Sequence, residues 1–166
     1  MKAVSDATPL IYLSKIGCVH FLKEVFEEIV ISEGIYDEVI VKGKEKGEND
    51  ILLIEEFIKE KFIIIKKPRA VMEIDKLDRG EKESISLCKE LKISTILIDE
   101  RAGFSVAQML NLIPIRTTSV FVILLDRKII NLNKYKELLK LLPEKGYFLD
   151  AQTYQKLLSI GETLGK

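Results

Sequence analysis

The chain has 166 residues, of which 47% are hydrophobic and 31% are charged. This length is that of one domain, and the composition is globular, which excludes an intrinsically disordered chain. Lys and Arg together number 26, as do Asp and Glu, so the formal net charge is zero. A global positive field for nucleic acid is therefore absent, and any such binding requires local basic patches.

The cysteines and the N-terminal residues bear on the cellular compartment. Cys18 and Cys88 lie far apart in apolar segments, so we expect buried reduced thiols. The first residues read directly as a strand, without the basic and apolar leader of a signal peptide. No apolar run approaches the length of a membrane span. We therefore expect a cytoplasmic protein without membrane contact.

Short β-branched runs alternate with helical patterns over the first 130 residues. Strands alternating with helices form right-handed βαβ units, which place the helices on both faces of a parallel sheet. The pattern therefore predicts an α/β fold, a three-layer α/β/α sandwich with a mainly parallel five-stranded sheet. Strands are predicted at 2–5, 28–31, 62–66, 95–98 and 114–117, and helices at 10–16, 19–26, 33–41, 51–61, 80–91, 102–110 and 119–126.

From Leu132 onward the pattern is wholly helical, with helices predicted at 134–142 and 150–160. Two terminal helices packed on the sheet explain this better than a second domain does. We therefore predict a single domain over residues 1–166, with an α/β core over about 1–130 and a C-terminal helical extension over about 131–166.

The first strand ends on an acid, Asp6. Thr8 is a good N-cap for the following helix, and Pro9 suits its first position, where a missing N–H costs nothing. This assignment leaves Asp6 without a capping role, although a turn former or cap is the common reading of a lone Asp at a strand end. Ligands of parallel α/β sheets bind beyond the carboxyl ends of the strands, so Asp6 is a candidate site residue.

Two further acids lie on helices that follow strands. Glu38 shares a helical face with Ile35 and Val39, so it borders an apolar stripe, although a surface position would also fit. Glu81 stands in the first turn of its helix. Its spacing from Asp78 is that of a capping box, so a cap and a site role are both open.

Asp99 follows Thr95–Ile98, a buried strand, and is the second acid at a strand end. It could also cap the helix that follows. Glu100 is expected to point elsewhere, and Arg101 could neutralise either acid. Together, Asp6, Glu38, Glu81 and Asp99 place four carboxylates where one cleft could gather them.

A bare cluster of four carboxylates repels itself, and a hard divalent cation relieves this repulsion. Ligation by oxygen alone suits Mg²⁺ or Mn²⁺, whereas one His and two separated Cys cannot build a zinc site. Such a cation can lower the pKa of an attacking water and stabilise charge on a phosphodiester. No nucleophile elbow and no Cys–His set offers another chemistry.

These segments resemble the PIN-domain family of ribonucleases, and more narrowly its subgroup of small uncharacterised prokaryotic proteins. The resemblance spans nearly the whole chain. It is carried by residues 4–11, 30–39, 80–85 and 97–101, and by the ending Gly146-Tyr147-Phe148-Leu149 with Leu157-Leu158 and Gly161-Glu162.

The resemblance implies a PIN-like sandwich in which Asp6, Glu38, Glu81 and Asp99 hold Mg²⁺ or Mn²⁺, or the water beside it. Many relatives are toxins that cleave RNA and are inhibited by a small antitoxin protein. Two features depart from the subgroup: Arg116-Thr117-Thr118-Ser119 replaces a Gly-Thr-x-Gly turn, and the third acid is Glu where Asp is common. We expect auxiliary roles for Ser5, Glu100, Arg101, Thr117 and Thr118.

Two functions from different classes follow. The first is a metal-dependent ribonuclease, of the kind that includes toxins paired with an antitoxin. The second is a catalytically inactive PIN-like scaffold that binds RNA or protein. A phospho-acceptor receiver domain fits less well, because it needs paired acids after the first strand.

Apolar surface on the helical tail favours a homodimer. The candidate contacts for RNA phosphates are Lys44, Lys46, Arg79, Arg101 and Arg116.

Overall fold

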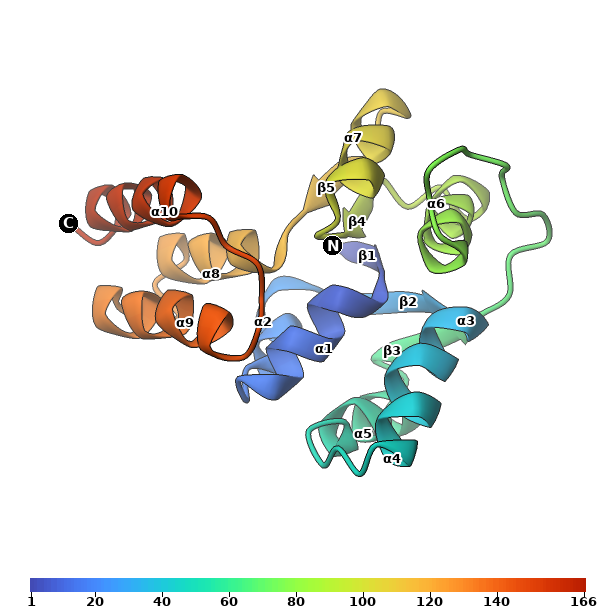
Figure 1. Ribbon diagram of the computed structural model, residues 1–166, viewed down its shortest axis with the longest axis horizontal. Helices are drawn as coiled ribbons and strands as arrows, with labels where there is room; N and C mark the ends of the chain where they lie inside the picture. Colours follow the sequence, from blue (N-terminus) through green and yellow to red (C-terminus); the bar gives the residue numbers. More distant parts are fainter.

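The computed structural model describes residues 1–166 and contains one five-stranded sheet (Figure 1). Every pair of neighbouring strands is parallel, and the order across the sheet is β3-β2-β1-β4-β5. This confirms the predicted parallel α/β/α sandwich. The strands are β1 (Lys2–Ser5), β2 (Glu28–Ser32), β3 (Ile63–Lys66), β4 (Thr95–Leu97) and β5 (Ile113–Ile115).

The helices follow the predicted order, with shifts of a few residues at their ends. They are α1 (Ala7–Lys15), α2 (Leu22–Val25), α3 (Glu33–Tyr36), α4 (Lys42–Glu45), α5 (Leu52–Lys59), α6 (Arg79–Leu91), α7 (Arg101–Met109), α8 (Thr117–Asp126), α9 (Leu132–Glu144) and α10 (Ala151–Leu164). Two irregular turns join them, the 3₁₀ turn η1 (Val19–Phe21) and the π-helix η2 (Asp37–Val41).

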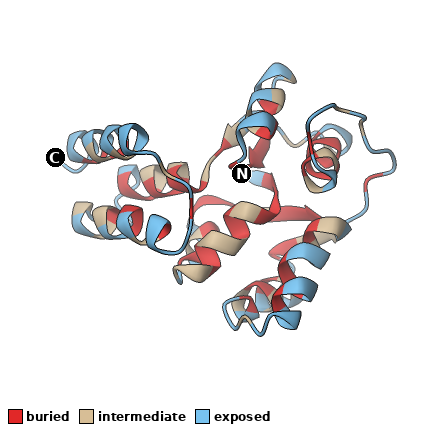
Figure 2. Ribbon diagram, in the orientation of Figure 1, coloured by how far each residue is buried: buried red, intermediate tan, exposed pale blue.

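Successive strand residues face opposite sides of the sheet, so each strand feeds two cores. Ala3 of β1 belongs to the larger cluster, beneath α1, α8 and α9. Val4 belongs to the smaller one, beneath α6 and α7. Figure 2 shows the buried strands between helices whose outer faces are exposed. With both faces covered, the two ends of the strands are where polar groups can gather on the sheet.

The C-terminal helices α9 and α10 pack against α8 and against each other, beside the sheet (Figure 1). Asn131 and Asp150 cap them, since each side chain accepts a hydrogen bond from a backbone N–H three residues later. Tyr135 and Leu157 are buried in the cluster that also contains Ala3 of the first strand. The connector between α9 and α10 returns toward the carboxyl end of the sheet.

The helical segment after β2 differs from its prediction. Ser32 caps it by accepting a hydrogen bond from the Ile35 N–H at 3.1 Å. The helix predicted over 33–41 extends further, because α4 continues to Glu45, and the left-handed residue after it is Gly47. A Cβ on Gly43 would lie 3.1 Å from Ile51, so this glycine allows close packing rather than a turn.

The strand predicted at 114–117 is also shorter than expected. It ends at Ile115, and Thr117 is already the first residue of α8. The reason is that the Thr117 N–H donates to the Asp99 carboxylate instead of to a neighbouring strand. None of the helices is both long enough and apolar enough to span a membrane.

Candidate active site

The carboxyl end of the sheet carries a hollow of about 420 Å³, here called the acid hollow. Three of the four predicted acids, Asp6, Glu38 and Glu81, line it. Two more carboxylates join them, so the hollow has five acids and one lysine. Its lining residues are Asp6, Thr8, Glu38, Lys76, Asp78, Glu81, Glu100 and Ala102.

Asp6 is nearly buried, with 5% of its surface exposed. Its backbone N–H donates to the Leu97 carbonyl at 2.9 Å, which fixes it beside the end of β4. Burial, and then the negative charge of Asp78, raise the pKa of Asp6 to about 8. A nearly buried carboxyl with this pKa is a group that a cation would ionise.

The prediction that Thr8 caps α1 and that Pro9 is its first residue is wrong. Asp6, and not Thr8, occupies the N-cap position, and the helix begins at Ala7. Pro9 is the third helical residue, where its missing N–H is still harmless because the first turn has no intrahelical partners. The Asp6 side chain nevertheless makes no capping hydrogen bond, so its carboxylate is not committed to the helix.

Glu81 has one engaged and one unengaged oxygen. Asp78 and Glu81 form the capping box that their spacing predicts: the Glu81 N–H donates to Asp78 Oδ1 at 2.8 Å, and the Asp78 N–H donates to Glu81 Oε2 at 3.0 Å. Glu81 Oε1 is buried without a hydrogen-bond partner and lies against Gly103. Burial raises the pKa of this carboxyl. The cap therefore leaves one oxygen for another role.

Glu38 is exposed and belongs to the π-helix η2, which interrupts an otherwise α-helical segment. Its neighbour Val39 is buried in the larger core, so the segment is anchored while Glu38 faces the hollow. Single π turns within helices are frequent at functional sites. Glu38 also lines a second hollow of about 360 Å³, here called the lysine hollow, with Thr8, Ile11, Tyr12, Lys15, Val39, Lys42, Gly43, Lys46 and Glu48.

Asp99 is the predicted acid that the structure places apart. It lines a neighbouring space of about 630 Å³, here called the tyrosine hollow. This hollow shares Thr8 and Glu100 with the acid hollow, so the two adjoin. The lining residues are Thr8, Tyr12, Asp99, Glu100, Arg101, Arg116, Thr118, Gly146, Tyr147, Phe148, Leu149, Asp150 and Thr153.

The Asp99 carboxylate accepts three hydrogen bonds. Oδ1 accepts from the Thr117 N–H at 2.8 Å and from the Tyr147 hydroxyl at 2.7 Å, and Oδ2 accepts from Thr117 Oγ1 at 2.7 Å. Burial raises the pKa of Asp99, and these hydrogen bonds oppose that rise. As the side chains stand, no three His, Cys, Asp or Glu residues form a group that could hold a metal ion.

Three of the five auxiliary residues line the hollows, and the other two are buried beside them. Thr117 is fully buried on Asp99, whereas Thr118 and Arg101 line the tyrosine hollow. Glu100 lines both hollows. Ser5 is buried, and its hydroxyl donates to the Asp6 backbone carbonyl, so it does not reach the carboxylates.

Asp78, Lys76 and Tyr147 are among the residues of these hollows that the sequence does not predict as site residues. Asp78 was expected only as a cap, yet its charge is close enough to raise the pKa of Asp6. The capping spacing itself was the signal that could have found it. Lys76 falls in the connector before α6, and Tyr147 reaches Asp99 across 48 residues, so neither position has a local sequence signal.

Tyr147→Phe is expected to lower the free energy of unfolding by about 1 to 3 kcal/mol, because Asp99 then loses a buried donor. Urea unfolding followed by circular dichroism measures the change. Tyr154→Phe is the matched control, since the Tyr154 hydroxyl makes no hydrogen bond to protein. Equal stability of the two variants would contradict a structural role for the Tyr147 hydroxyl.

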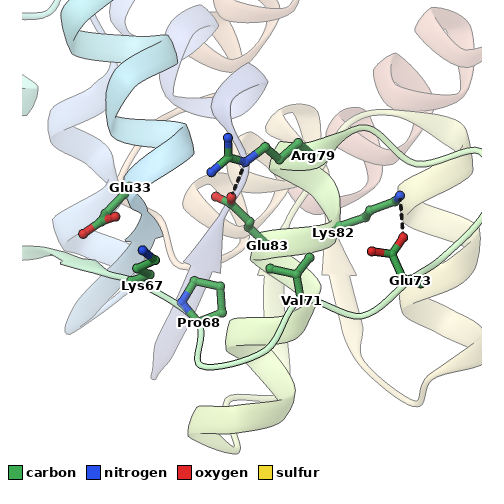
Figure 3. Close-up of a pocket in the computed structure, with 8 residues that line it drawn as sticks. All are labelled: Glu33, Lys67, Pro68, Val71, Glu73, Arg79, Lys82 and Glu83. Atoms are coloured by element: carbon green, nitrogen blue, oxygen red, sulfur yellow. Dashed lines mark hydrogen bonds and ion pairs between the residues drawn. The ribbon is translucent and has the colours of Figure 1, made fainter.

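A further hollow of about 320 Å³ opens beside the N-terminal half of α6, between that helix and the ends of β2 and β3 (Figure 3). Its acids are largely neutralised. Arg79 Nε contacts Glu83 at 2.6 Å, and Lys82 contacts Glu73 at 3.3 Å. Paired charges of this kind stabilise the surface and leave no carboxylate cluster for a cation, so we place the candidate active site at the acid hollow.

Comparisons with known proteins bear on the family and on the fold. The sequence matches the family model DUF3368, described as a PIN domain, over residues 2–162. A PilT N-terminus domain protein from the hyperthermophilic archaeon Sulfolobus solfataricus has a similar structure. Its TM-score is 0.53 at 15% sequence identity, over 72% of this chain and 90% of that one, which supports the fold. A search of curated proteins finds no match. On the match to the family model over almost its entire length, the chain belongs to the PIN-domain family.

Proposed function

We propose that this protein is a ribonuclease that hydrolyses RNA phosphodiester bonds at the acid hollow with Mg²⁺ or Mn²⁺. PIN domains generally are nucleases, which supports the reaction class. The observation that carries the proposal is the pair of nearly buried acids, Asp6 and Glu81. Both have a raised pKa, and Glu81 Oε1 is without a partner.

The residues present fit a hard divalent cation. The donors on the hollow are carboxylate oxygens, which Mg²⁺ and Mn²⁺ prefer. Asp6, Glu38 and Glu81 would hold the cation. When bound, it would lower the pKa of the attacking water and stabilise the charge that develops on the phosphodiester.

Asp99 enters the proposal as the fourth acid, beside the other three. Oδ2 accepts a single hydrogen bond, so it keeps a lone pair that can accept from water. Thr117 and Tyr147 hold this carboxylate in one orientation. Its negative charge would add to the field that attracts a cation to the acid hollow.

Some of the lysine and arginine side chains around the acid hollow form ion pairs, and others do not. Lys44 and Arg79 form ion pairs with Glu55 and Glu83, so they are poor candidates for phosphate contacts. Lys76 is the one lysine on the acid hollow and forms no ion pair, so it can meet the phosphate there. Lys46, Arg101 and Arg116 are likewise without ion pairs and line the adjoining hollows, as do Lys15 and Lys42.

The finer biological assignment rests on the family resemblance. We propose a cytoplasmic enzyme that acts as a toxin and is held inactive by a small antitoxin protein. We also propose a homodimer, because the apolar side chains Met109 and Ile113 are exposed at the β5 edge.

A PIN-like scaffold that binds RNA or protein without cleaving it is the alternative. The engaged carboxylate of Asp99 and the absence of a preformed three-residue metal group favour it.

The test is cleavage of an end-labelled single-stranded RNA with Mn²⁺, with Mg²⁺ and with EDTA. Glu38→Gln is expected to slow cleavage by about 10- to 100-fold, because it removes a ligand charge. Glu38 is exposed, so the fold should survive. Glu45→Gln makes the same charge change on the same helical segment outside the hollow and is expected to leave the rate unchanged. Cleavage in EDTA, or equal rates for both variants, would contradict the proposal, and RNA binding without cleavage would favour the scaffold.

A further inference from the structure

The tyrosine hollow has a composition unlike that of the acid hollow. It carries two arginines and three aromatic residues, Tyr12, Tyr147 and Phe148, beside three acids. Of these acids, Asp99 is buried on Thr117 and Tyr147, and Asp150 is engaged in capping α10. Only the charge of Glu100 is exposed and without a partner in the protein. The hollow therefore offers positive charge and aromatic surface next to a negatively charged site.

The two arginines are available for an anion because neither forms an ion pair. Arg116 is held in place from two sides: Nη1 donates to the Asp99 carbonyl at 2.9 Å, and its guanidinium lies 4.4 Å from the centroid of the Phe104 ring. The remaining N–H groups of Arg116 are uncommitted within the protein. Arg101 is exposed at the start of α7, on the same hollow. A fixed guanidinium that is not neutralised suits a phosphate group.

The aromatic residues come from the connector between α9 and α10, which is fastened at both sides of Phe148. Tyr147 is buried, donates to Asp99 and packs edge-to-face on Tyr12 with 5.2 Å between ring centroids. The Tyr12 hydroxyl in turn donates to the Gly146 carbonyl at 3.1 Å. Leu149, on the other side, is half-buried against the larger core. Phe148 itself is 88% exposed.

A single exposed apolar side chain is ordinary on a protein surface. Phe148 differs because its backbone is held on both sides while its ring stands at a hollow with two unpaired arginines. Aromatic rings beside arginines are the elements that proteins use for unpaired nucleotides: the base stacks on the ring, and the phosphate meets the guanidinium. A base inside a duplex cannot present its face to a ring in this way.

We propose that the tyrosine hollow binds one unpaired nucleotide of the RNA substrate, with its base stacked on Phe148 and its phosphate on Arg116 and Arg101. This inference deepens the proposed function, because it makes the substrate single-stranded next to the cleaved bond. Thr8 and Glu100 border both hollows, so a chain that occupies the tyrosine hollow continues directly into the acid hollow.

Phe148→Trp provides a direct readout, because the chain contains no tryptophan and the substitution introduces a single fluorophore at an exposed position. An unlabelled RNA of ten adenosines is added in EDTA, so that no cleavage occurs. It is expected to quench the tryptophan fluorescence, and the quenching should reach a plateau as the RNA concentration rises. A blunt-ended RNA duplex at the same phosphate concentration is expected not to quench it. Leu52→Trp, at another exposed apolar position outside these hollows, is the control and is expected to stay unquenched by either RNA.

Affinity gives a second, independent measurement. Phe148→Ala is expected to weaken binding of a labelled 10-mer by on the order of tenfold in fluorescence anisotropy, the typical effect of losing one base–aromatic stack. With an abasic oligonucleotide of the same length, wild type and variant should bind with equal affinity. Leu52→Ala is expected to bind as the wild type does.

Each outcome decides the proposal. Quenching by the duplex as strongly as by the single strand, or unchanged affinity in Phe148→Ala, would overturn it and leave Phe148 to a protein partner. Because these measurements need neither metal nor turnover, they are separable from the nuclease activity. Quenching without any cleavage would retain the subsite and reject the nuclease, and cleavage without quenching would do the reverse.

Discussion

Asp6→Asn is expected to abolish metal-dependent cleavage and, in the same protein, to increase thermal stability. The loss of activity should be at least about a hundredfold, because the variant removes a charged ligand from the centre of the proposed cation site. Cleavage of labelled RNA in Mn²⁺ measures it. The gain in stability has a separate cause, which is the cost of ionising a nearly buried carboxyl.

The sign of the stability effect follows from the two pKa values. Asp6 titrates near 3.8 in the unfolded chain and near 8 in the folded protein. The folded state therefore binds more protons between these values, and the free energy of unfolding falls as the pH rises from about 4 to about 8. At pH 7 the folded protein keeps Asp6 mostly protonated whereas the unfolded chain ionises it, and this difference costs on the order of 2 to 4 kcal/mol of stability. Asn carries no charge, so the variant avoids this cost.

Thermal unfolding in EDTA measures this change. The Tm of Asp6→Asn should exceed that of the wild type by roughly 5 to 15 °C near pH 8, and the difference should shrink toward pH 4. Asp126→Asn, an exposed acid elsewhere, is expected to show no such pH dependence. Mn²⁺ should raise the Tm of the wild type and close the gap. A variant whose Tm follows that of the wild type across this range would show that Asp6 titrates normally.

Gly103→Ala is expected to reduce cleavage by about a hundredfold through a displacement of Glu81. A Cβ at residue 103 would lie 2.5 Å from Glu81 Oε1 and would also collide with Ile98 Cδ1. A displacement of about 1 Å in a catalytic group can cost this much activity. The strain should also lower the free energy of unfolding by about 1 to 3 kcal/mol, partly offset by the better helix propensity of Ala.

The double variant Ile98→Val/Gly103→Ala separates these two effects. Valine lacks Cδ1, so it removes the clash with residue 98 while the clash with Glu81 remains. We expect stability to recover in part and cleavage to stay low. Recovery of both together would mean that the activity loss came from general destabilisation, and that Gly103 has no specific relation to the Glu81 carboxylate.

The sheet could be predicted because its signals are local. Residues 63–65 are three consecutive isoleucines, and such β-branched runs between helical patterns predict buried parallel strands. Element ends were less predictable. Both Asp6 and Thr8 are good N-caps, and nothing in their neighbours decides between them. The π-helix at Asp37–Val41 also has no sequence pattern that distinguishes it from the α-helix around it.

The site was predictable only to the extent that topology determines it. Asp6 and Glu81 could be brought together because the N-terminal residues of α6 and the end of β1 lie at one edge of a parallel sheet. The side-chain partners could not be found in this way. The separation of Asp99 into its own hollow depends on Tyr147, whose position follows from how α9 and α10 pack and not from any pattern near the acid.

The bond between Tyr147 and Asp99 has a consequence for synthesis in the cell. A growing polypeptide cannot supply the phenol until residue 147 has been added, long after Asp99 and the five strands have been synthesised. Nascent and prematurely terminated chains therefore lack both this donor and the neighbouring Phe148. If cleavage depends on them, chains that stop before residue 147 are expected to be inactive.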